Sequence, residues 1–314
     1  MRIALDEAIP APERGTVVAL GTFDGLHLGH RLLLGRARAL AKEKGLKSAA
    51  LTFLKPPGSY LGRGKRLLLP PELKLKLLEE EVDLVVVADF PKLRGLRPEE
   101  FTRLLAARLR PAYVVVGEDY RFGRDREGDA ALLRELGEAQ GFQVEALPRL
   151  AIAGRPVSST AVREAIQAGK IEEARALLGY PPLLVGPVVR GEGRGQKLGF
   201  PTANLRLSEE LVTPPDGVYA VEVKLAKASL QFPGLLYIGR RPTFDGKERS
   251  YEVYILDFSG ELYGEELELS LLRRLRGDLE FPDPQALQRQ IELDLQEAQK
   301  FFKEAARTAP APGI

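Results

Sequence analysis

The chain has 314 residues, 44% of them hydrophobic and 29% charged, which is typical of a folded globular protein of about two domains. Its 46 basic and 44 acidic side chains are mixed along the sequence, which argues against nucleic-acid or anionic-membrane partners. Without cysteine there can be no disulfide, thiolate metal site or thiol nucleophile, and without a signal-like or membrane-spanning apolar run we expect a cytoplasmic protein.

The first half of the chain alternates short apolar runs with longer segments of helical periodicity. We expect strands at residues 16–20, 48–53, 83–90, 112–117 and 142–147, separated by helices at 29–45, 71–80, 98–109 and 129–141. Because the runs are almost continuously apolar, the strands should be buried on both faces, which predicts a Rossmann-like parallel sheet flanked by helices. Ligands of such sheets bind beyond the carboxyl ends of the strands.

The pattern changes near Tyr180, after two short expected helices at 158–169 and 171–179. We therefore predict an α/β domain at 1–180, a second domain at 181–308 and a tail at 309–314. Strand-like segments broken by glycine and proline predict an antiparallel β-barrel in the second domain, at 183–191, 203–207, 217–225, 234–239, 250–258 and 265–275. A final helix at 283–306 carries Leu287, Ile291, Leu295 and Ala298 on one face, which is typical of core packing.

Both histidines of the chain, His27 and His30, lie in the segment "GTFDGLHLGH" between the first expected strand and helix. Gly21 and Gly29 let the backbone turn and approach a phosphate, and the helix start points free amide groups at the same place. The two imidazoles can stabilise charge on such a phosphate, or they can simply cap and pack the helix. A zinc pair would lack further His or Cys ligands.

This segment resembles the HxGH signature of nucleotidylyltransferases, in the form found in prokaryotic bifunctional riboflavin kinase and FAD synthetase proteins. Residues 115–129, "VVGEDYRFGRDREGD", and 157–166, "VSSTAVREAI", resemble two further segments of that family, in the family's order. The resemblance implies catalytic roles for His27 and His30. It also implies flavin binding by Asp119 and Arg121, and ATP or phosphate binding by Gly21, Asp24, Gly29, Ser159, Thr160 and Arg163.

These residue types also have ordinary structural explanations. Ser159 and Thr160 would be normal N-capping residues, and Arg163 a normal solvated residue, although hydroxyl and guanidinium groups at a helix start also suit a triphosphate. Phe122 is expected to fill the core rather than contact flavin. The family usually shows a threonine-phenylalanine pair followed by proline, a basic or imidazole residue and proline. Residues 52–57 depart from this pattern, since they read "TFLKPP", with lysine entering and histidine absent.

The segment "VVRGEGRGQKLGFPTANL", residues 188–205, resembles the riboflavin kinase motif. Such a glycine-rich loop is often only a hairpin connection, but here it precedes Thr202 and Asn204, whose oxygens are the hard ligands that Mg²⁺ prefers. The resemblance implies ATP with Mg²⁺ held by Thr202 and Asn204, beneath a flap whose phosphate-binding residues include Gly191, Gly195 and Gly199.

Three later segments, "PPDGVYA", "YIGRRPTF" and "SYEVYILDFSGELYG", resemble the same kinase module. Strand alternation puts Glu252 and Tyr254 on one face and Val253 and Ile255 on the other. A strand glutamate is usually solvated, but the family's general base occupies the position of Glu252. Tyr254 and Tyr237 stand where histidine and asparagine are common in the family.

The resemblance implies a two-step flavin enzyme that contacts small molecules only. In the first step Glu252 accepts a proton from riboflavin as ATP phosphorylates it to FMN. In the second, FMN attacks a further ATP, giving FAD and pyrophosphate, while His27 and His30 stabilise phosphate charge.

Two alternatives remain open. The altered "TFLKPP" segment allows a working kinase with a degenerate adenylyltransferase, which would accumulate FMN. A flavin or nucleotide sensor that contacts a partner protein would bind ligands without needing Glu252, His27 and His30. A third interpretation, an aminoacyl-tRNA synthetase fragment that shares the HxGH chemistry, is discounted because it gives the segment "GFPTANL" no role.

Overall fold

The computed structural model describes residues 2–5, 15–60, 62, 64, 66–191, 199–225, 230–243 and 246–308. By its internal contacts the chain divides into two compact units. One comprises Met1–Ala161 with Leu177–Gly179, and the other comprises Val162–Ala176 with Tyr180–Ile314. In the part of the chain that the structure describes, no helix is long and apolar enough to span a bilayer.

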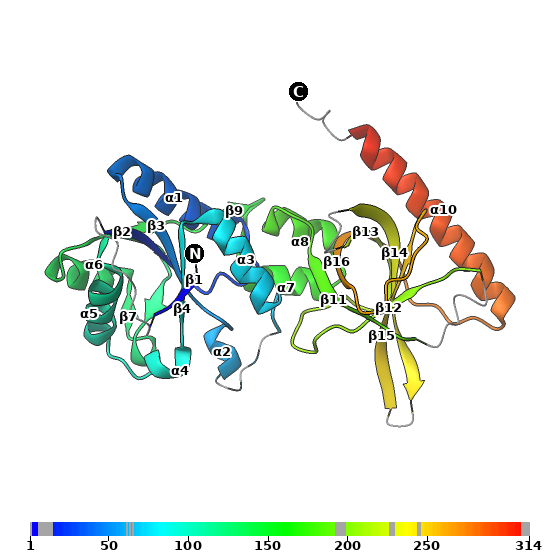
Figure 1. Ribbon diagram of the computed structural model, residues 1–314, viewed down its shortest axis with the longest axis horizontal. Coiled ribbons are helices and arrows are strands. Elements are labelled where there is room, and N and C mark those ends of the chain that lie inside the picture. Colours follow the sequence, from blue (N-terminus) through cyan, green and yellow to red (C-terminus); the bar gives the residue numbers. More distant parts are fainter. Residues whose placement is uncertain are drawn as a thin grey trace. The chain divides into compact units, whose positions relative to one another are not determined.

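The first unit is built on a parallel sheet with the strand order β1-β4-β3-β2-β5-β8. Figure 1 shows the helices that surround this sheet. Its strands are β1 (Arg2–Ala4), β2 (Thr16–Leu20), β3 (Lys47–Phe53), β4 (Leu84–Ala88), β5 (Pro111–Gly117) and β8 (Gln143–Leu147). All five residues of β2 are buried, so the prediction of a parallel sheet with both faces covered is confirmed. The edge strand β1 was not predicted.

Helices connect these strands close to the expected positions. They are α1 (Leu28–Lys44), α3 (Pro71–Glu81), α5 (Pro98–Leu109) and α6 (Ala130–Ala139). Helix α1 ends where Gly45 adopts φ 65°, a left-handed conformation that favours glycine. The order of the strands reverses between β2 and β5, and in open α/β sheets this is the point where ligands bind.

Several short elements of the first unit lack the periodicity that would reveal them in the sequence. They are α2 (Pro57–Tyr60), α4 (Phe90–Leu93), the short 3-10 helix Arg124–Arg126, and the strand pairs β6 (Arg121–Phe122) with β7 (Gly128–Asp129) and β9 (Ala151–Ile152) with β10 (Arg155–Pro156). Phe122 is buried in the core beside Phe101, with ring centroids 5.5 Å apart, as expected.

The second unit is a closed antiparallel barrel with the strand order β11-β12-β15-β14-β13-β16, which confirms the predicted architecture. Its strands are β11 (Leu183–Val189), β12 (Ala203–Leu205), β13 (Gly217–Leu225), β14 (Gln231–Thr243), β15 (Gly246–Ile255) and β16 (Glu266–Gly277). Strands β14 and β15 form a longer hairpin than the sequence pattern predicted. The barrel interior holds Leu205, Leu236 and Val253.

Three further helices accompany the barrel: α7 (Ser159–Gln167), α8 (Ile171–Leu178) and α10 (Pro284–Thr308). Ile171 of α8 is fully buried in the barrel core, which explains why most of α8 groups with the second unit. Helix α10 runs along one side of the barrel (Figure 1). The expected tail at 309–314 lies outside the described residues.

Candidate active sites

The first candidate site is a cavity of about 490 Å³ at the carboxyl ends of β2, β5 and β8. Its position matches the reversal in strand order, where the loops after β2 and β5 diverge and leave a crevice. Eight of the predicted site residues line it, namely Gly21, His27, Gly29, His30, Asp119, Arg121, Ser159 and Thr160.

His27 is the N-cap residue of α1. Its Nδ1 accepts a hydrogen bond from the backbone N–H of His30 at 3.3 Å. A neutral imidazole with an accepting Nδ1 carries its proton on Nε2, so this contact sets His27 as an Nε2–H donor. A Cβ at Gly29 would lie only 3.3 Å from the His27 ring, so the glycine gives this imidazole its space. His27 therefore both caps the helix and lines the cavity.

His30 stacks on His27, with ring centroids 3.6 Å apart and planes at 15°. Burial holds the pKa of His30 well below its usual range, and nearby positive charge, on Lys74 and on His27 whenever that ring is protonated, adds to that effect. His30 is therefore neutral at neutral pH. Its Nδ1 is buried and has no hydrogen-bond partner among the described residues, so a polar group of a ligand can satisfy it.

The start of α7 is tied to the histidine loop. Ser159 Oγ donates to the backbone carbonyl of Asp24 at 2.8 Å, while Ser158 Oγ accepts from Ala161 N at 3.1 Å and so caps the helix. Ser158 is thus the capping serine, and the Ser159 hydroxyl instead donates to the carbonyl of Asp24 in the histidine loop. The sequence "SST" does not show which of the two serines caps the helix.

Two predicted phosphate residues do not line this cavity in the described part of the chain. The Asp24 carboxylate is buried, and its Oδ1 accepts from the backbone N–H of Leu68 at 3.1 Å, so it fixes the loop before α3. Arg163 is buried further along α7, in the second unit.

Two arginines that were not predicted, Arg126 and Arg149, also line the cavity. Arg149 pairs with Asp119 at 2.5 Å, and Arg121 pairs with Asp129 at 3.0 Å. Arg149 follows the carboxyl end of β8, and this position after a parallel strand was a usable signal. Arg126 follows Asp125, and both have positive φ, of 63° and 52°, which no sequence pattern announces.

Lys74 joins the histidine loop to the end of β3, although the sequence did not single it out. It is 2% exposed, and its Nζ donates to the carbonyls of Phe53, of Leu54 at 3.1 Å and of Thr22 at 3.4 Å. Thr52 Oγ1 also donates to the Thr22 carbonyl, at 3.0 Å. Burial lowers the pKa of Lys74 to about 8. The altered "TFLKPP" segment is therefore held firmly against the site loop.

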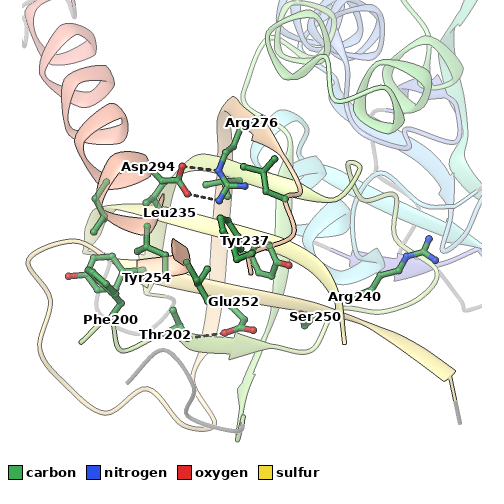
Figure 2. Close-up of a pocket in the computed structure, with 16 residues that line it drawn as sticks. Phe200, Thr202, Leu235, Tyr237, Arg240, Ser250, Glu252, Tyr254, Arg276 and Asp294 are labelled. Carbon is green, nitrogen blue, oxygen red and sulfur yellow. Dashed lines mark hydrogen bonds and ion pairs between the residues drawn. The ribbon is translucent and has the colours of Figure 1, made fainter. Parts of the chain in front are cut away.

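The second candidate site lies on the outer face of the barrel. Figure 2 shows this cavity, of about 290 Å³, between the barrel strands and α10. Glu252, Tyr254 and Tyr237 line it, while Val253 and Ile255 are buried inside the barrel, so the predicted alternation along β15 is confirmed. Phe200 meets Tyr254 edge-on at 6.0 Å. The cavity thus combines apolar walls with two carboxylates, Glu252 and Asp294, of which Asp294 is paired with Arg276.

A hydrogen bond joins the two halves of the kinase motif. Thr202 Oγ1 donates to Glu252 Oε2 at 3.1 Å (Figure 2), and Asn204 of β12 lies directly opposite Glu252 of β15. Residues directly opposite each other on paired strands project from the same face, so the three side chains form one polar cluster. Thr202 and Glu252 are 50 residues apart in the sequence, and the pairing of β12 with β15 brings them together.

The residues that line a neighbouring cavity of about 550 Å³ include Gly191, Thr202, Asn204 and Tyr263. Thr202 therefore lines both cavities. Position 191 has room only for glycine as the chain is folded, because a Cβ there would lie 2.1 Å from Nδ2 of Asn204. Gly199 has φ 86°, a conformation that favours glycine, and is not among the described residues lining either cavity. Gly195 lies outside the described residues.

The Thr202 and Asn204 oxygens fit a Mg²⁺ ion that is shared with nucleotide phosphates. Among the described residues no three His, Cys, Asp or Glu side chains gather as a metal site. Mg²⁺ keeps several waters and is commonly held by one or two protein oxygens plus substrate phosphates, so a dedicated acidic cage is not needed. Because Gly191 has no side chain, the Asn204 amide can pack directly against it, on the wall of the neighbouring cavity.

Two family models match the chain, FAD synthetase over residues 9–161 and riboflavin kinase over residues 178–302. The bifunctional riboflavin kinase/FMN adenylyltransferase of Listeria monocytogenes is 38% identical, over 91% of this chain and 92% of the relative. The Escherichia coli K12 protein of the same description is 36% identical, over 93% and 94%.

A solved structure is also similar over nearly its whole length. A crystal structure titled as a macrolide-efflux protein from Streptococcus pneumoniae matches with TM-score 0.85 and 32% identity, over 94% of this chain and 96% of that chain. Its title names a different activity from the two enzymes above, but the folds agree. With two family models in order and relatives matched almost end to end, the chain belongs to the bifunctional riboflavin kinase/FMN adenylyltransferase family.

Proposed function

We propose that this chain makes FAD from riboflavin in two ATP-dependent steps, in the cytoplasm. Residues 181–308 phosphorylate riboflavin to FMN, and residues 1–180 adenylylate FMN to FAD with release of pyrophosphate. The observation that carries the proposal is the Thr202–Glu252 hydrogen bond at the junction of two cavities. An apolar cavity with a carboxylate suits a flavin, and a neighbouring cavity with amide and hydroxyl oxygens suits a nucleotide.

In the kinase step, riboflavin occupies the cavity beneath α10 with its terminal hydroxyl at Glu252. ATP occupies the neighbouring cavity with its γ-phosphate at Thr202 and Asn204. Glu252 takes the hydroxyl proton as the oxygen attacks the γ-phosphorus, and ADP leaves. Thr202 and Asn204 would hold Mg²⁺, which when bound would neutralise phosphate charge. Gly191, Gly195 and Gly199 belong to the flap that covers the phosphates.

In the adenylyltransferase step, the FMN phosphate attacks the α-phosphorus of ATP. The nucleophile is already an anion, so the site supplies position and charge neutralisation rather than a base. His27 donates through Nε2–H, and neutral His30 contributes a second polar group in the same stack. Gly21, Gly29, Ser159 and Thr160 contact the ATP phosphates, and Asp119 and Arg121 contact the flavin. Asp24 and Arg163 are not among the described residues that line the cavity, so for them we propose indirect parts, Asp24 through the loop that it fixes and Arg163 through the packing of α7.

Product chromatography tests both assignments at once. Purified protein is given riboflavin, ATP and Mg²⁺, and Glu252→Gln is run beside a His27→Ala, His30→Ala double variant. We expect FAD from the wild type, no FMN from the glutamate variant and accumulated FMN from the histidine variant. FMN supplied directly should still become FAD with Glu252→Gln. Wild-type protein that stops at FMN would support the degenerate-adenylyltransferase alternative, and absence of both products would support the sensor.

A further inference from the structure

One wall of the proposed flavin cavity is a helix rather than a strand. Leu287, Ile291 and Leu295 of α10 line the cavity opposite Leu235 of the barrel. Below them Ala298 is fully buried, in a small apolar cluster shared with the outer face of the barrel. The width of the cavity therefore depends on where α10 lies along the barrel surface.

A buried ion pair fastens this helix to the barrel. Asp294 of α10 is 4% exposed and faces Arg276 near the end of β16, whose side chain is 17% exposed, and both residues also line the cavity. Arg276 donates from Nε to Asp294 Oδ1 at 2.8 Å and from Nη2 to Asp294 Oδ2 at 2.7 Å. Figure 2 marks both hydrogen bonds. Gln290 Nε2 adds a third donor to Oδ1 at 2.9 Å, from one turn earlier on α10.

The pair is also anchored on the barrel side. Arg276 Nη1 donates to the backbone carbonyl of Gly277 at 2.9 Å, and its guanidinium lies 6.0 Å from the centre of the Phe281 ring. Phe281 is another lining residue of the cavity. The arginine thus orders both the helix and the segment that leads into it.

Burial of two charges is an inefficient way to stabilise a helix contact, because desolvation offsets most of the attraction. Apolar side chains would hold α10 as strongly, but they allow it to slide. A two-pronged arginine–carboxylate pair accepts one distance and one orientation only. Its contribution is therefore to fix the position of the helix, and with it the Leu287, Ile291 and Leu295 wall.

We propose that Arg276 and Asp294 are positioning residues for the kinase step, which set riboflavin affinity by holding α10 as a wall of the flavin cavity. The proposal rests on the assignment of riboflavin to that cavity. It assigns them no part in proton or phosphoryl transfer, which occurs at Glu252 and Thr202. Loss of the pair therefore weakens riboflavin binding more than it slows turnover of bound riboflavin.

The test measures KM for riboflavin, kcat of FMN formation and the Kd from quenching of riboflavin fluorescence. Asp294→Asn keeps the shape of the side chain and removes its charge. We expect KM and Kd to rise about tenfold, the equivalent of one charge-assisted hydrogen bond, while kcat changes by less than about threefold. FAD formation from supplied FMN should not change, since it uses the other unit.

Two further variants keep the test decisive. Glu268→Gln is the matched control variant. Glu268 lies on β16, as Arg276 does, and forms an ion pair at 3.9 Å with Lys224 of β13. Loss of this pair should leave the KM for riboflavin unchanged. Arg276→Met with Asp294→Leu restores apolar packing without the fixed geometry, so it should fold yet keep a raised KM. If this folded double variant and Asp294→Asn both bind riboflavin like the wild type, the positioning role is refuted. If wild-type protein forms no FMN at all, the proposed function fails instead.

Discussion

Gly191→Ala offers a sharp test of the nucleotide side of the kinase site. The backbone of Gly191 is not in a left-handed conformation, so only space opposes a larger residue. A Cβ there would lie 2.1 Å from Nδ2 and 2.4 Å from Cγ of Asn204, whereas ordinary contact begins at 3.4 Å. The Asn204 amide must therefore retreat by about 1.3 Å, the difference between 3.4 and 2.1 Å.

That displacement is large for a phosphoryl-transfer site. A misplacement of about 1 Å in a reacting geometry can cost about 100-fold in rate. Asn204 is paired with Glu252 across β12 and β15, so its shift disturbs the polar cluster from the phosphate side. We expect kcat for FMN formation to fall by about two orders of magnitude. The change in riboflavin affinity should be small, because Gly191 does not line the flavin cavity among the described residues.

The assay is FMN formation from riboflavin and ATP, followed by chromatography, with FAD formation from supplied FMN as the internal control. Gly35→Ala is the matched control variant, since nothing lies within 4 Å of a Cβ there. Asn204→Ala should reproduce the loss. A Gly191→Ala protein that unfolds at the wild-type temperature and phosphorylates riboflavin at the wild-type rate would refute both the geometry and the role of Asn204.

Three further predictions follow from the two sites. Glu252→Gln should lower FMN formation by about 10²- to 10⁴-fold, the usual worth of a general base, in a steady-state assay. His27→Ala should lower FAD formation from FMN by about 10²- to 10³-fold and leave FMN formation intact, as measured by chromatography. Between pH 8 and 10.5 the unfolded chain holds more protons at Lys74 than the folded protein does, so folding stability should rise with pH there. Relative to Lys74→Met in urea unfolding, the gain should approach about 3 kcal/mol.

Each of these predictions has a result that contradicts it. Retained FMN formation in Glu252→Gln would remove the glutamate from proton transfer. Equal loss of both activities in His27→Ala would indicate damage to folding rather than to one site. A pH-independent stability difference between wild type and Lys74→Met would mean that Lys74 is not buried as a charged group.

The fold was predictable because its main elements carry strong local patterns. Nearly continuous apolar runs such as residues 112–117 identify strands buried on both faces, and capping residues and glycines delimit the helices. The three-residue strand β1 has no period to detect, and it is defined only by its pairing with β4. Likewise α2 and α4 are single turns, which local sequence does not distinguish from loops.

The residues that line the cavities were predictable where they are contiguous in sequence. His27 and His30 share one loop, and Thr202 and Asn204 share one motif. Lys74, Arg126 and Arg149 were missed because each lies on a different segment and joins its site only through tertiary structure. Lys74 did leave one trace, since it interrupts an apolar helical stretch with a charge that had to find partners.

The apolar face of helix α10 was identified from the sequence, but what that face contacts was not. Periodicity identified the buried face through Leu287, Ile291 and Ala298, but it does not distinguish a face that packs on a core from one that walls a cavity. The distinguishing signal is Asp294, which lies seven residues after Leu287 and so falls on that same apolar face. A carboxylate there is costly unless a cation meets it, so its presence implied a partner across the interface. Arg276 is that partner, and the helix it holds faces the proposed flavin rather than a sealed core.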